Sequence, residues 1–344
     1  MSLGLGMGAI RAAARRIAPH IHRTPVFRSR SLDAMANAEL FFKCENLQRT
    51  GSFKIRGAAN AVLSLSDEEA ARGVATHSSG NHGAALACAA RLRGIAAYIV
   101  VPSNAPEVKK RAIADFGGAI TFCEPTLAAR EEAIRKILAE TGAVLIHPYN
   151  DERIITGQAT AALELLEEIP DLDALLAPVS GGGLLSGTAI AAKALQPQIA
   201  VIGCEPAGAD DAYRSLAAGR IMPMDNPQTI ADGLRASLCP LTFGILRQHV
   251  DRVVLVSEDE IVEGMRLLWE RLKLVVEPSG AVAASAALFG KLGPGAFDGG
   301  ADKSDGKGAG LPRPDKSGEA ARRAPRLGII LSGGNVDLAR LPFR

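Results

Sequence analysis

Residues 174–195, ALLAPVSGGGLLSGTAIAAKAL, hold the arrangement on which the fold depends: an apolar run, a glycine-rich turn and a run of small residues. The first six residues predict a buried strand, and residues 184–195 predict a helix that begins after the glycines. Without side chains, Gly181, Gly182 and Gly183 allow their backbone N–H groups to converge on one anion at the positive end of the helix dipole. A phosphate is the natural occupant. A plain strand-to-helix turn with nothing bound has the same pattern.

Apolar runs of strand length recur along the chain, separated by alanine-rich helical stretches. These runs are residues 40–43, 97–101, 120–123, 201–204 and 327–331. Strands that alternate with helices are typical of crossovers around parallel sheets. The sequence therefore predicts an α/β fold of mainly parallel, twisted sheets flanked by helices.

Helices are also predicted near both ends of the chain. Residues 1–32 contain arginines and no acidic residue, as an organellar transit peptide would. However, residues 9–17 have the pattern of an amphipathic first helix, and we favour that interpretation. A second helix is predicted over residues 281–292.

Composition limits the class of protein. With 344 residues and 47% hydrophobic content, the chain is long enough for two domains with a substantial core. A net charge of +2 and 4% aromatic residues argue against nucleic-acid binding, and no apolar stretch has the length of a membrane span. Five cysteines occur singly with no CxxC pair, which favours a reducing compartment, the cytoplasm, over a disulfide framework or a zinc site.

Residues 51–56, GSFKIR, place Lys54 between small or apolar neighbours. A buried ammonium group loses hydration, so its pKa falls and the amine becomes a nucleophile able to form a Schiff base with an aldehyde. The alternative is a solvated surface lysine, because most lysines are exposed.

Two more glycine-rich turns, SSGNHG at residues 78–83 and SGGN at 332–335, occur where apolar runs end or helices begin. Together with SFKIRGA at 52–58 and SGGG at 180–183, they form four motifs in a fixed order. In this order the chain, from about residue 8 to 340, resembles the pyridoxal-phosphate (PLP) dependent serine/threonine dehydratase and serine racemase family. The resemblance implies a two-domain fold like that of the tryptophan synthase β subunit, PLP fold type II.

The resemblance also implies how the domains are divided. Residues 73–148 would form a small domain with the loop that binds the substrate carboxylate, inserted in a large PLP-binding domain of residues 1–72 and 149–344. The cofactor would lie in the cleft between them. Residues 293–326, rich in Gly, Lys, Asp, Pro and Arg, predict a solvated insertion, since they cannot bury enough apolar surface to order themselves. A homodimer is expected from the resemblance alone.

The family pattern assigns cofactor contacts to particular residues. PLP would be attached to Lys54, and the freed lysine would then remove the Cα proton of the substrate. Gly233 would let the cofactor ring lie flat, although a simple turn glycine would look the same. Many relatives have glycine where this chain has Ser180. The implied cofactor-binding residues are Lys54, Phe53, Asn81, Ser180, Gly181, Gly182, Gly183, Gly233 and Ser332.

Ser332 bears on the type of reaction. In the family pattern it faces the pyridine nitrogen, and a hydroxyl group supplies no charge that would hold this nitrogen protonated. The ring is then a weaker electron sink. This favours rapid loss of a β-hydroxyl group, or racemisation, over transamination.

The loop at residues 78–82 is implied to bind substrate. Its N–H groups, from Ser78, Ser79, Gly80, Asn81 and His82, would receive the carboxylate. Ser79 matches the family serine that, in racemases, protonates Cα on the face opposite the lysine, a role that requires a proton donor within hydrogen-bond reach. Many dehydratases carry a similar motif, so Ser79 permits racemisation without establishing it. Asn81 as a loop cap and His82 as a packing residue are the alternatives.

Residues 205–211, EPAGADD, offer the carboxylates of Glu205 and Asp211 and the carbonyl of Ala209. Such hard oxygen ligands suit Mg²⁺, Mn²⁺ or Ca²⁺. Spacing alone also fits a solvated acidic turn. Racemase-like members bind a divalent cation at the matching positions, so we expect a structural metal that braces the large domain away from the chemistry.

The predicted function is that of a PLP-dependent ammonia-lyase acting on L-serine, L-threonine or a related β-hydroxy amino acid. The products would be a 2-oxo acid and ammonia. Alternatives that stay open are a serine racemase with side dehydratase activity, a 3-hydroxyaspartate dehydratase, a β-replacement synthase and a non-catalytic phosphate-binding scaffold.

Overall fold

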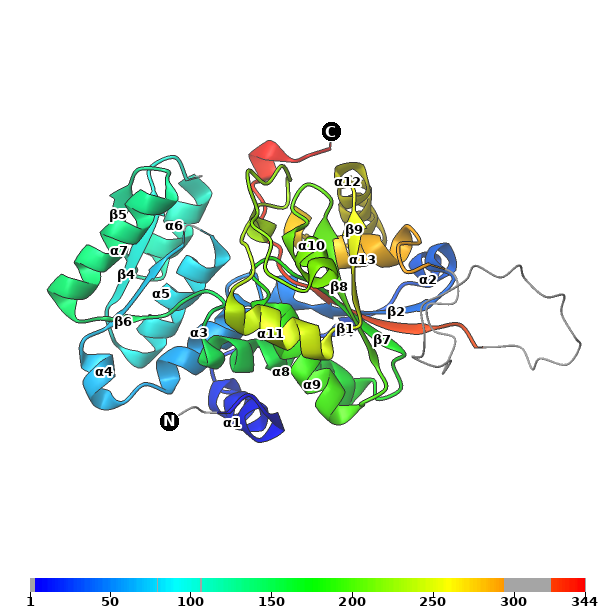
Figure 1. Ribbon diagram of the computed structural model, residues 1–344, viewed down its shortest axis with the longest axis horizontal. Helices are drawn as coiled ribbons and strands as arrows, with labels where there is room; N and C mark the ends of the chain where they lie inside the picture. Colours follow the sequence, from blue (N-terminus) through cyan, green and yellow to red (C-terminus); the bar gives the residue numbers. More distant parts are fainter. Residues whose placement is uncertain (1–3, 79, 106, 294–322, 344) are drawn as a thin grey trace, which may run out of the picture.

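The computed structural model describes residues 4–78, 80–105, 107–293 and 323–343, and it contains two sheets with helices on both faces of each (Figure 1). A six-stranded sheet lies in one half of the molecule and a four-stranded sheet in the other. The predicted α/β class with parallel sheets is confirmed.

The large sheet has the order β1-β2-β10-β7-β8-β9, and only the β1–β2 pair is antiparallel. All of the runs predicted as strands in this half form strands. The strands are β1 Val26–Phe27, β2 Glu39–Cys44, β7 Ala174–Pro178, β8 Ala200–Pro206, β9 Arg252–Val256 and β10 Arg326–Leu331.

The small sheet has the order β5-β4-β3-β6 and is entirely parallel. Its strands are β3 Val74–His77, β4 Ala97–Pro102, β5 Ala119–Cys123 and β6 Val144–Leu145. The two sheets thus use the residue ranges that the sequence analysis assigned to two domains. The limits of the domains themselves stay a prediction.

Helices occupy most of the remaining described chain. The α-helices are α1 Met7–Ile17, α2 Arg30–Ala36, α3 Lys54–Leu63, α4 Asp67–Ala71, α5 Asn81–Arg93, α6 Glu107–Asp115, α7 Leu127–Thr141, α8 Glu152–Glu168, α9 Gly183–Leu195, α10 Asp211–Ala218, α11 Pro240–His249, α12 Glu258–Leu267 and α13 Pro278–Leu288. Short turns of other helix types are η1 Glu45–Leu47, η2 Asp232–Leu234, the π-helix η3 Leu268–Leu272 and η4 Leu338–Arg340.

The predicted first helix is confirmed as α1, whose Ile10, Ala13 and Ile17 are buried. The helix predicted over residues 281–292 is wrong at both ends. It starts earlier because Pro278 is tolerated in the first turn, and it stops at Leu288 because the next residue leaves the helical conformation. Of the predicted insertion at 293–326, residues 294–322 lie outside the described residues.

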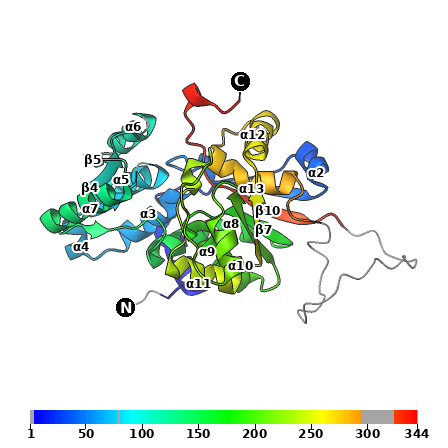
Figure 2. The same ribbon diagram turned by 45° about the horizontal axis from the view of Figure 1, so that its top comes forward.

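Successive side chains of the central strands point to opposite faces of the sheet, and both faces are covered by helices. This explains why apolar residues follow one another along these strands. In β7, Leu176 packs with α12 and α13 on one face, while Leu175 packs with α8, α9 and α11 on the other. In the small sheet, α3 and α5 cover one face and α7 the other; Figure 2 shows the same layers from a second direction. A parallel strand covered on both faces needs apolar side chains on both.

Glycines let three helices of the large half approach closely. A Cβ atom on Gly157 of α8 would lie 2.6 Å from the Arg56 carbonyl oxygen of α3. A Cβ atom on Gly187 of α9 would lie 2.5 Å from the Ile155 carbonyl oxygen of α8. Helix α3, which begins with Lys54, is therefore held against α8, and α8 against the helix that follows the glycine turn.

In the part of the chain that the structure describes, no helix is both long and apolar enough to cross a membrane. The five cysteines all lie in this part and are free.

Candidate active site

Lys54 is the first residue of helix α3 and is half-buried. Its Nζ donates to the carbonyl oxygen of Pro148 at 3.3 Å and lies 5.0 Å from the ring centroid of Phe53. Burial lowers the pKa of the Lys54 amine to about 8. Among the described residues no carboxylate forms an ion pair with it. Lys54 is thus not a solvated surface lysine, and a large fraction of its amine is neutral near pH 8.

The turn after β10 joins the loop that carries Lys54. Ser52 pairs with Gly333 as an antiparallel bridge, and the Phe53 N–H donates to the Ser332 carbonyl at 3.0 Å. The buried Ser332 hydroxyl donates to the Ser279 carbonyl at 3.4 Å, and the Ser279 hydroxyl accepts from the Gly233 N–H at 3.0 Å. Ser279 therefore joins Gly233 to Ser332, and Ser332 in turn binds Phe53, so three predicted cofactor-binding residues that are far apart in sequence lie close together.

The glycine turn between β7 and α9 has the backbone of an anion-binding site. Ser180 has φ of 56° and Gly182 φ of 87°, so the peptide units alternate in direction. Within the described residues the N–H groups of Gly181 and Gly183 have no hydrogen-bond partner. A positive φ is strained for serine, which explains why glycine suits position 180. A phosphate group fits the free N–H groups here.

Tyr149 lies against the same turn. A Cβ atom on Gly181 would come within 2.5 Å of its ring, and one on Gly183 within 2.9 Å of its Cβ. Tyr149 follows Pro148, whose carbonyl accepts from Lys54. The lysine and the glycine turn are thereby brought to the same place.

The loop before α5 presents a helix N-terminus to the site. Gly80 N–H donates to the Ser78 hydroxyl at 3.4 Å, and α5 begins at Asn81. A Cβ atom on Gly83 would lie 2.2 Å from the Ser78 carbonyl oxygen, so only glycine allows the loop to fold back on the helix. Free N–H groups at a helix N-terminus attract a carboxylate. Ser79 lies outside the described residues.

The Asn81 side chain is fixed on two sides by the other half of the molecule. Its Nδ2 donates to Glu277 Oε1 at 2.7 Å, and its Oδ1 accepts from Asn335 Nδ2 at 2.9 Å. Asn335 also donates to the Thr50 carbonyl at 2.8 Å. Burial, followed by the charge of Asp232, raises the pKa of Glu277 to about 8. Asn81 is therefore held by contacts between the two halves and is more than a loop cap.

His82 is buried, and its Nε2 lies 3.1 Å from the Ile146 carbonyl oxygen. Burial, and then the charge of Lys54, lowers the pKa of His82 to about 3. A histidine that stays neutral at physiological pH, and that donates through Nε2 to a carbonyl, suits packing of the loop better than proton transfer.

A second histidine shapes the turn that follows β6. The Nδ1 of His147 accepts from the N–H groups of Tyr149 at 3.3 Å and Asn150 at 2.9 Å. Its ring makes edge contacts with His77 at 5.9 Å and with Tyr149 at 4.6 Å between centroids. Burial lowers the pKa of His147 to about 4, and the charge of His77 adds to the effect. The neutral ring keeps Pro148 and Tyr149 beside Lys54.

Sequence reasoning missed four residues of this site: Tyr149, Glu277, Ser279 and Asn335. Three of them lie in or next to a sequence pattern that predicts a turn or a helix start. Asn335 belongs to the SGGN motif, and Glu277 and Ser279 flank the proline at the start of α13. Tyr149 gave no such signal, because only the folded chain places it on the glycine turn.

The predicted metal residues are buried together, so the alternative of a solvated turn is wrong. The Glu205 carboxylate accepts from the N–H groups of Ala212 at 3.3 Å and Tyr213 at 2.9 Å. Asp211 accepts from the Leu238 N–H at 2.9 Å, while its buried Oδ1 has no partner within the described residues. Burial raises the pKa of Glu205 to about 8 and that of Asp211 to about 6.

On the family resemblance alone, this carboxylate pair is expected to lie away from the chemistry. The structure instead places it close to the glycine turn. Leu238, whose N–H binds Asp211, lies 2.9 Å from the Cβ position of Gly182. Among the described residues, no group of three or more His, Cys, Asp or Glu side chains gathers for a metal. The site would therefore rest on two carboxylates, the buried Ala209 carbonyl and water.

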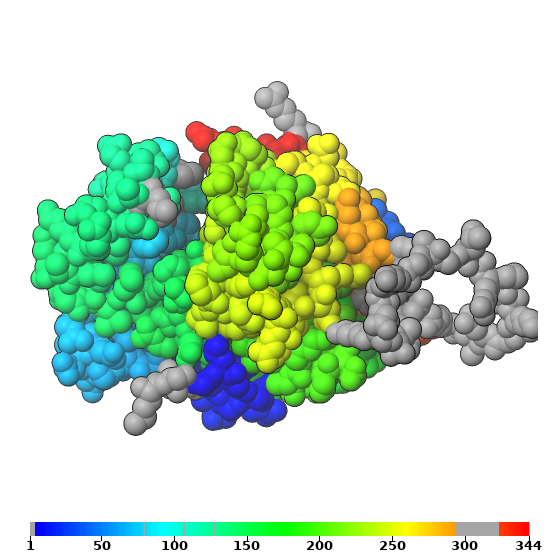
Figure 3. Space-filling model, viewed as in Figure 1, coloured from blue at the N-terminus to red at the C-terminus, as the bar shows by residue number. Residues whose placement is uncertain are grey.

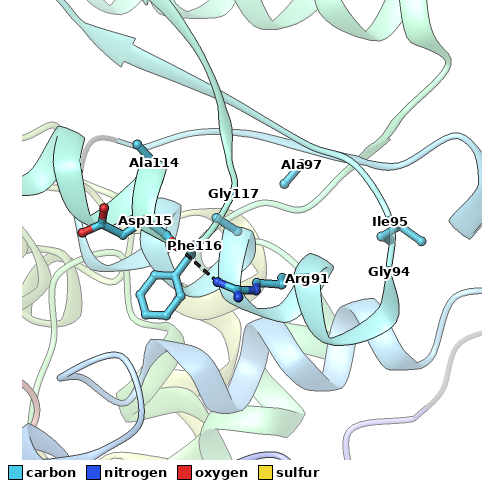
Figure 4. Close-up of a pocket in the computed structure, with 9 residues that line it drawn as sticks. Arg91, Gly94, Ile95, Ala97, Ala114, Asp115, Phe116 and Gly117 are labelled. Carbon is cyan, nitrogen blue, oxygen red and sulfur yellow. Dashed lines mark hydrogen bonds between the residues drawn. The ribbon is translucent and has the colours of Figure 1, made fainter.

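The space-filling view shows a groove between the two halves (Figure 3). A separate hollow of about 370 Å³ lies on the outside of the small half, between the ends of α5 and α6 (Figure 4). Arg91, Ile95 and Phe116 line it, and Arg91 donates to the Asp115 carbonyl at 3.2 Å. None of the predicted site residues lines this hollow.

A lysine without a carboxylate partner, beside a turn with free N–H groups, is the arrangement by which enzymes hold a phosphorylated aldehyde covalently. The sequence matches the family described as "Pyridoxal-phosphate dependent enzyme" over residues 17–300. The chain belongs to this family of PLP-dependent enzymes.

The names of similar proteins include both racemases and a dehydratase. A serine racemase of Arabidopsis thaliana is 50% identical over 333 residues, covering 97% of this chain and 94% of the relative. A beta-hydroxyaspartate dehydratase of Paracoccus denitrificans is 47% identical over 332 residues, covering 96% of each chain. The solved structure of maize serine racemase has a TM-score of 0.88 at 46% identity, covering 97% of this chain and 94% of that one.

Proposed function

We propose that this PLP-dependent enzyme eliminates the β-hydroxyl group of a small β-hydroxy amino acid to give a 2-oxo acid and ammonia. The observation that carries the proposal is that Lys54 has no described carboxylate partner and that the Ser332 hydroxyl donates to the Ser279 carbonyl and not to a carboxylate. Serine at this place leaves the pyridine nitrogen without a counter-charge.

The residues of the site fit the cofactor and divide its tasks. When bound, PLP would supply an electron sink for the electron pair that stays on Cα when its proton is removed. The N–H groups of Gly181 and Gly183 would hold its phosphate, and Asn81 its ring hydroxyl. The N-terminus of α5 would orient the substrate carboxylate, and the neutral amine of Lys54 would accept the Cα proton.

Racemisation is the second candidate, and the similar racemases from plants favour it. It requires a proton donor on the face opposite Lys54, the role proposed for Ser79. The substrate is proposed to be L-serine, L-threonine or 3-hydroxyaspartate, the last on the strength of the similar dehydratase.

We also propose a divalent cation, Mg²⁺, Mn²⁺ or Ca²⁺, on Glu205, Asp211 and the Ala209 carbonyl. The support is the buried Asp211 Oδ1 without a described partner and the mutual repulsion of two buried carboxylates, which a cation would relieve. Through Asp211, which accepts from the Leu238 N–H, the cation would steady the glycine turn. A homodimer in the cytoplasm completes the proposal, and the five free cysteines suit a reducing compartment.

The first experiment tests the enzyme against a non-catalytic scaffold. Purified protein is expected to show the yellow absorbance of attached PLP, and Lys54→Ala should abolish it because it removes the amine that would hold the cofactor. Lys110→Ala, on the surface of α6, is the control. Yellow protein from the Lys54 variant would contradict the role of Lys54.

Product analysis then separates the reactions. The protein is incubated with L-serine, L-threonine and 3-hydroxyaspartate, after chelation and again with added Mg²⁺. Keto acid is expected to dominate and to increase with Mg²⁺, whereas D-serine as the main product would establish the racemase instead. Ser79→Ala should suppress D-serine formation far more than elimination, and equal losses would remove its proposed role.

A further inference from the structure

A group of fully paired charges lies buried behind Lys54. This buried ion cluster consists of Lys43, Glu45, Arg56 and Glu164, of which only Glu164 is partly exposed, at 14% of its side chain. Its cations and carboxylates balance in number. None of these residues belongs to the site described above.

Arg56 is the centre of the cluster, and all its N–H groups are used. Glu45 accepts from its Nε at 2.7 Å and its Nη2 at 2.8 Å. Glu164 accepts from its Nη1 at 2.8 Å and its Nη2 at 2.9 Å. The remaining Nη1 hydrogen reaches the Thr160 hydroxyl at 3.1 Å. A guanidinium group has no donor beyond these, so its orientation is fully determined.

The cluster ties together the elements that place Lys54. Lys43 of β2 donates to Glu164 of α8 at 2.7 Å and to the Thr24 carbonyl at 2.7 Å. Glu45 belongs to η1, and Arg56 lies in the first turn of α3. A strand of the large sheet and helix α8 thus fix the rotation of α3 at its beginning.

Two residues along a helix correspond to a turn of about 200°, so Lys54 and Arg56 leave α3 on opposite sides. Arg56 faces the core and Lys54 the glycine turn. The titratable groups that act electrostatically with Lys54 are His82 and His147, both neutral near pH 7 because burial lowers the pKa of each. The two carboxylates of the cluster, Glu45 and Glu164, both accept from Arg56.

Stability alone does not account for such a cluster. Buried ion pairs cost several kcal/mol of desolvation per ion, and apolar residues of similar volume often stabilise a protein as well or better. We infer that Arg56 is a positioning residue: with Lys43 it neutralises Glu45 and Glu164 and holds the start of α3, so that Lys54 is aimed at the glycine turn and no unbalanced carboxylate lies behind it. The inference rests on the proposed role of Lys54 in binding PLP.

The inference can be tested by changing the charge of the cluster in both directions, because the pKa of Lys54 should then shift in opposite directions. The full-length protein is freed of PLP, its fold is checked by circular dichroism, and acetylation of Lys54 by limiting acetic anhydride is followed against pH by peptide mass spectrometry. Only the neutral amine reacts, so the midpoint reports the pKa of Lys54. Arg56→Met leaves an unbalanced carboxylate and should move the midpoint up by about one pH unit.

Two further variants keep the test decisive if Arg56→Met does not fold. Glu164→Gln leaves an unbalanced cation and should move the midpoint down, and the double variant Arg56→Met with Glu164→Gln should restore it. Arg16→Gln is the matched control, because Arg16 donates to Asn60 of the same helix at 2.5 Å from outside the cluster. Shifts of the same sign in the two single variants, or none, would overturn the inference.

A parallel measurement separates this inference from the proposed function. PLP is added to each variant, and the yellow absorbance and the lysine that carries the cofactor are determined. If the wild type never attaches PLP at Lys54, the proposed function fails while the acetylation midpoints still judge the cluster. If PLP is attached to Lys54 but the acetylation midpoints do not shift with the charge of the cluster, the inference about Arg56 is wrong while the proposed function stands.

Discussion

At the scale of single residues, the site depends on buried groups whose charge state differs from that in water. Burial favours the neutral form of both Lys54 and Glu277. A neutral amine can act as a base, and a protonated carboxyl group can bind Asn81 without adding a negative charge near Lys54. The site thus keeps its chemistry near neutral pH by excluding water rather than by pairing charges.

Glu277 supplies a test of this view at the residue scale. Its pKa is about 8 in the folded chain against 4.5 as the ordinary value, so the folded protein retains a proton that the unfolded chain loses between these pH values. Stability therefore falls as pH rises from about 4.5 to 8. Glu277→Gln, which cannot ionise, should unfold at nearly the wild-type temperature at pH 4.5 and a few °C above it at pH 8.

The measurement is the thermal midpoint of each protein across this pH range. Glu270→Gln, on the exposed π-helix, is the control and should follow the wild type. A constant difference between Glu277→Gln and wild type at every pH would mean that Glu277 does not hold a proton in the folded chain.

At the scale of secondary-structure elements, the site is aligned by helices that meet through glycines. Gly187 lets α9 touch the backbone of α8, with the Ile155 carbonyl oxygen 2.5 Å and the Ala159 nitrogen 2.7 Å from its Cβ position. Backbone atoms cannot rotate away as a side-chain end can. The distance between the two helices is therefore set by the absence of one Cβ atom.

Gly187→Ala is expected to lower the free energy of unfolding by about 1–3 kcal/mol, because it forces α8 and α9 apart. PLP retention should weaken with it, since α9 begins at the glycine turn. Gly244→Ala is the matched control at an exposed position of α11, where nothing lies within 4 Å of the Cβ position; it should be neutral or stabilising by up to about 1 kcal/mol. Denaturant unfolding measures both, and equal effects would refute the close-contact argument.

Much at this scale was predictable. The strand at residues 174–178 and the helix from Gly183 follow from the apolar run and the three glycines, and both are observed. The end of α13 was not predictable, because the apolar pattern continues past Leu288 while the chain turns away. Periodicity shows that a residue is buried and leaves open whether it is buried in a helix or beyond its end.

At the scale of the whole molecule, the two halves share an apolar core around α3 and α5, and a few polar contacts also join them. Asn81 reaches Glu277 and Asn335, and Lys109 of α6 forms an ion pair with Asp232 of η2, directly before Gly233. An ion pair this exposed contributes about 0.2–1 kcal/mol. Such a weak contact is suited to two halves that move apart and together during each turnover.

Reversing the charge in Lys109→Glu is expected to raise KM two- to fivefold while leaving the thermal midpoint unchanged, because it opposes closure without disturbing a core. Adding Asp232→Lys to the same chain should restore KM. Lys110→Glu is the control, since Lys110 pairs with Glu107 within α6. KM is measured by steady-state kinetics. A double variant whose KM is as high as that of Lys109→Glu alone would argue against the ion pair between the two halves.

The sequence by itself determined the class of fold and the chemistry of the turns. Apolar runs of strand length, and glycines where an N–H group must be free, are local requirements that any folded form of this chain meets. It also singled out Lys54, Asn81 and Ser332, because each belongs to a short motif. Only the tertiary structure decided their surroundings: Tyr149 against the glycine turn, Ser279 between Gly233 and Ser332, and Arg56 holding two carboxylates behind Lys54. Burial and pairing depend on residues that are distant in sequence, so the charge state of a side chain is a property of the folded chain.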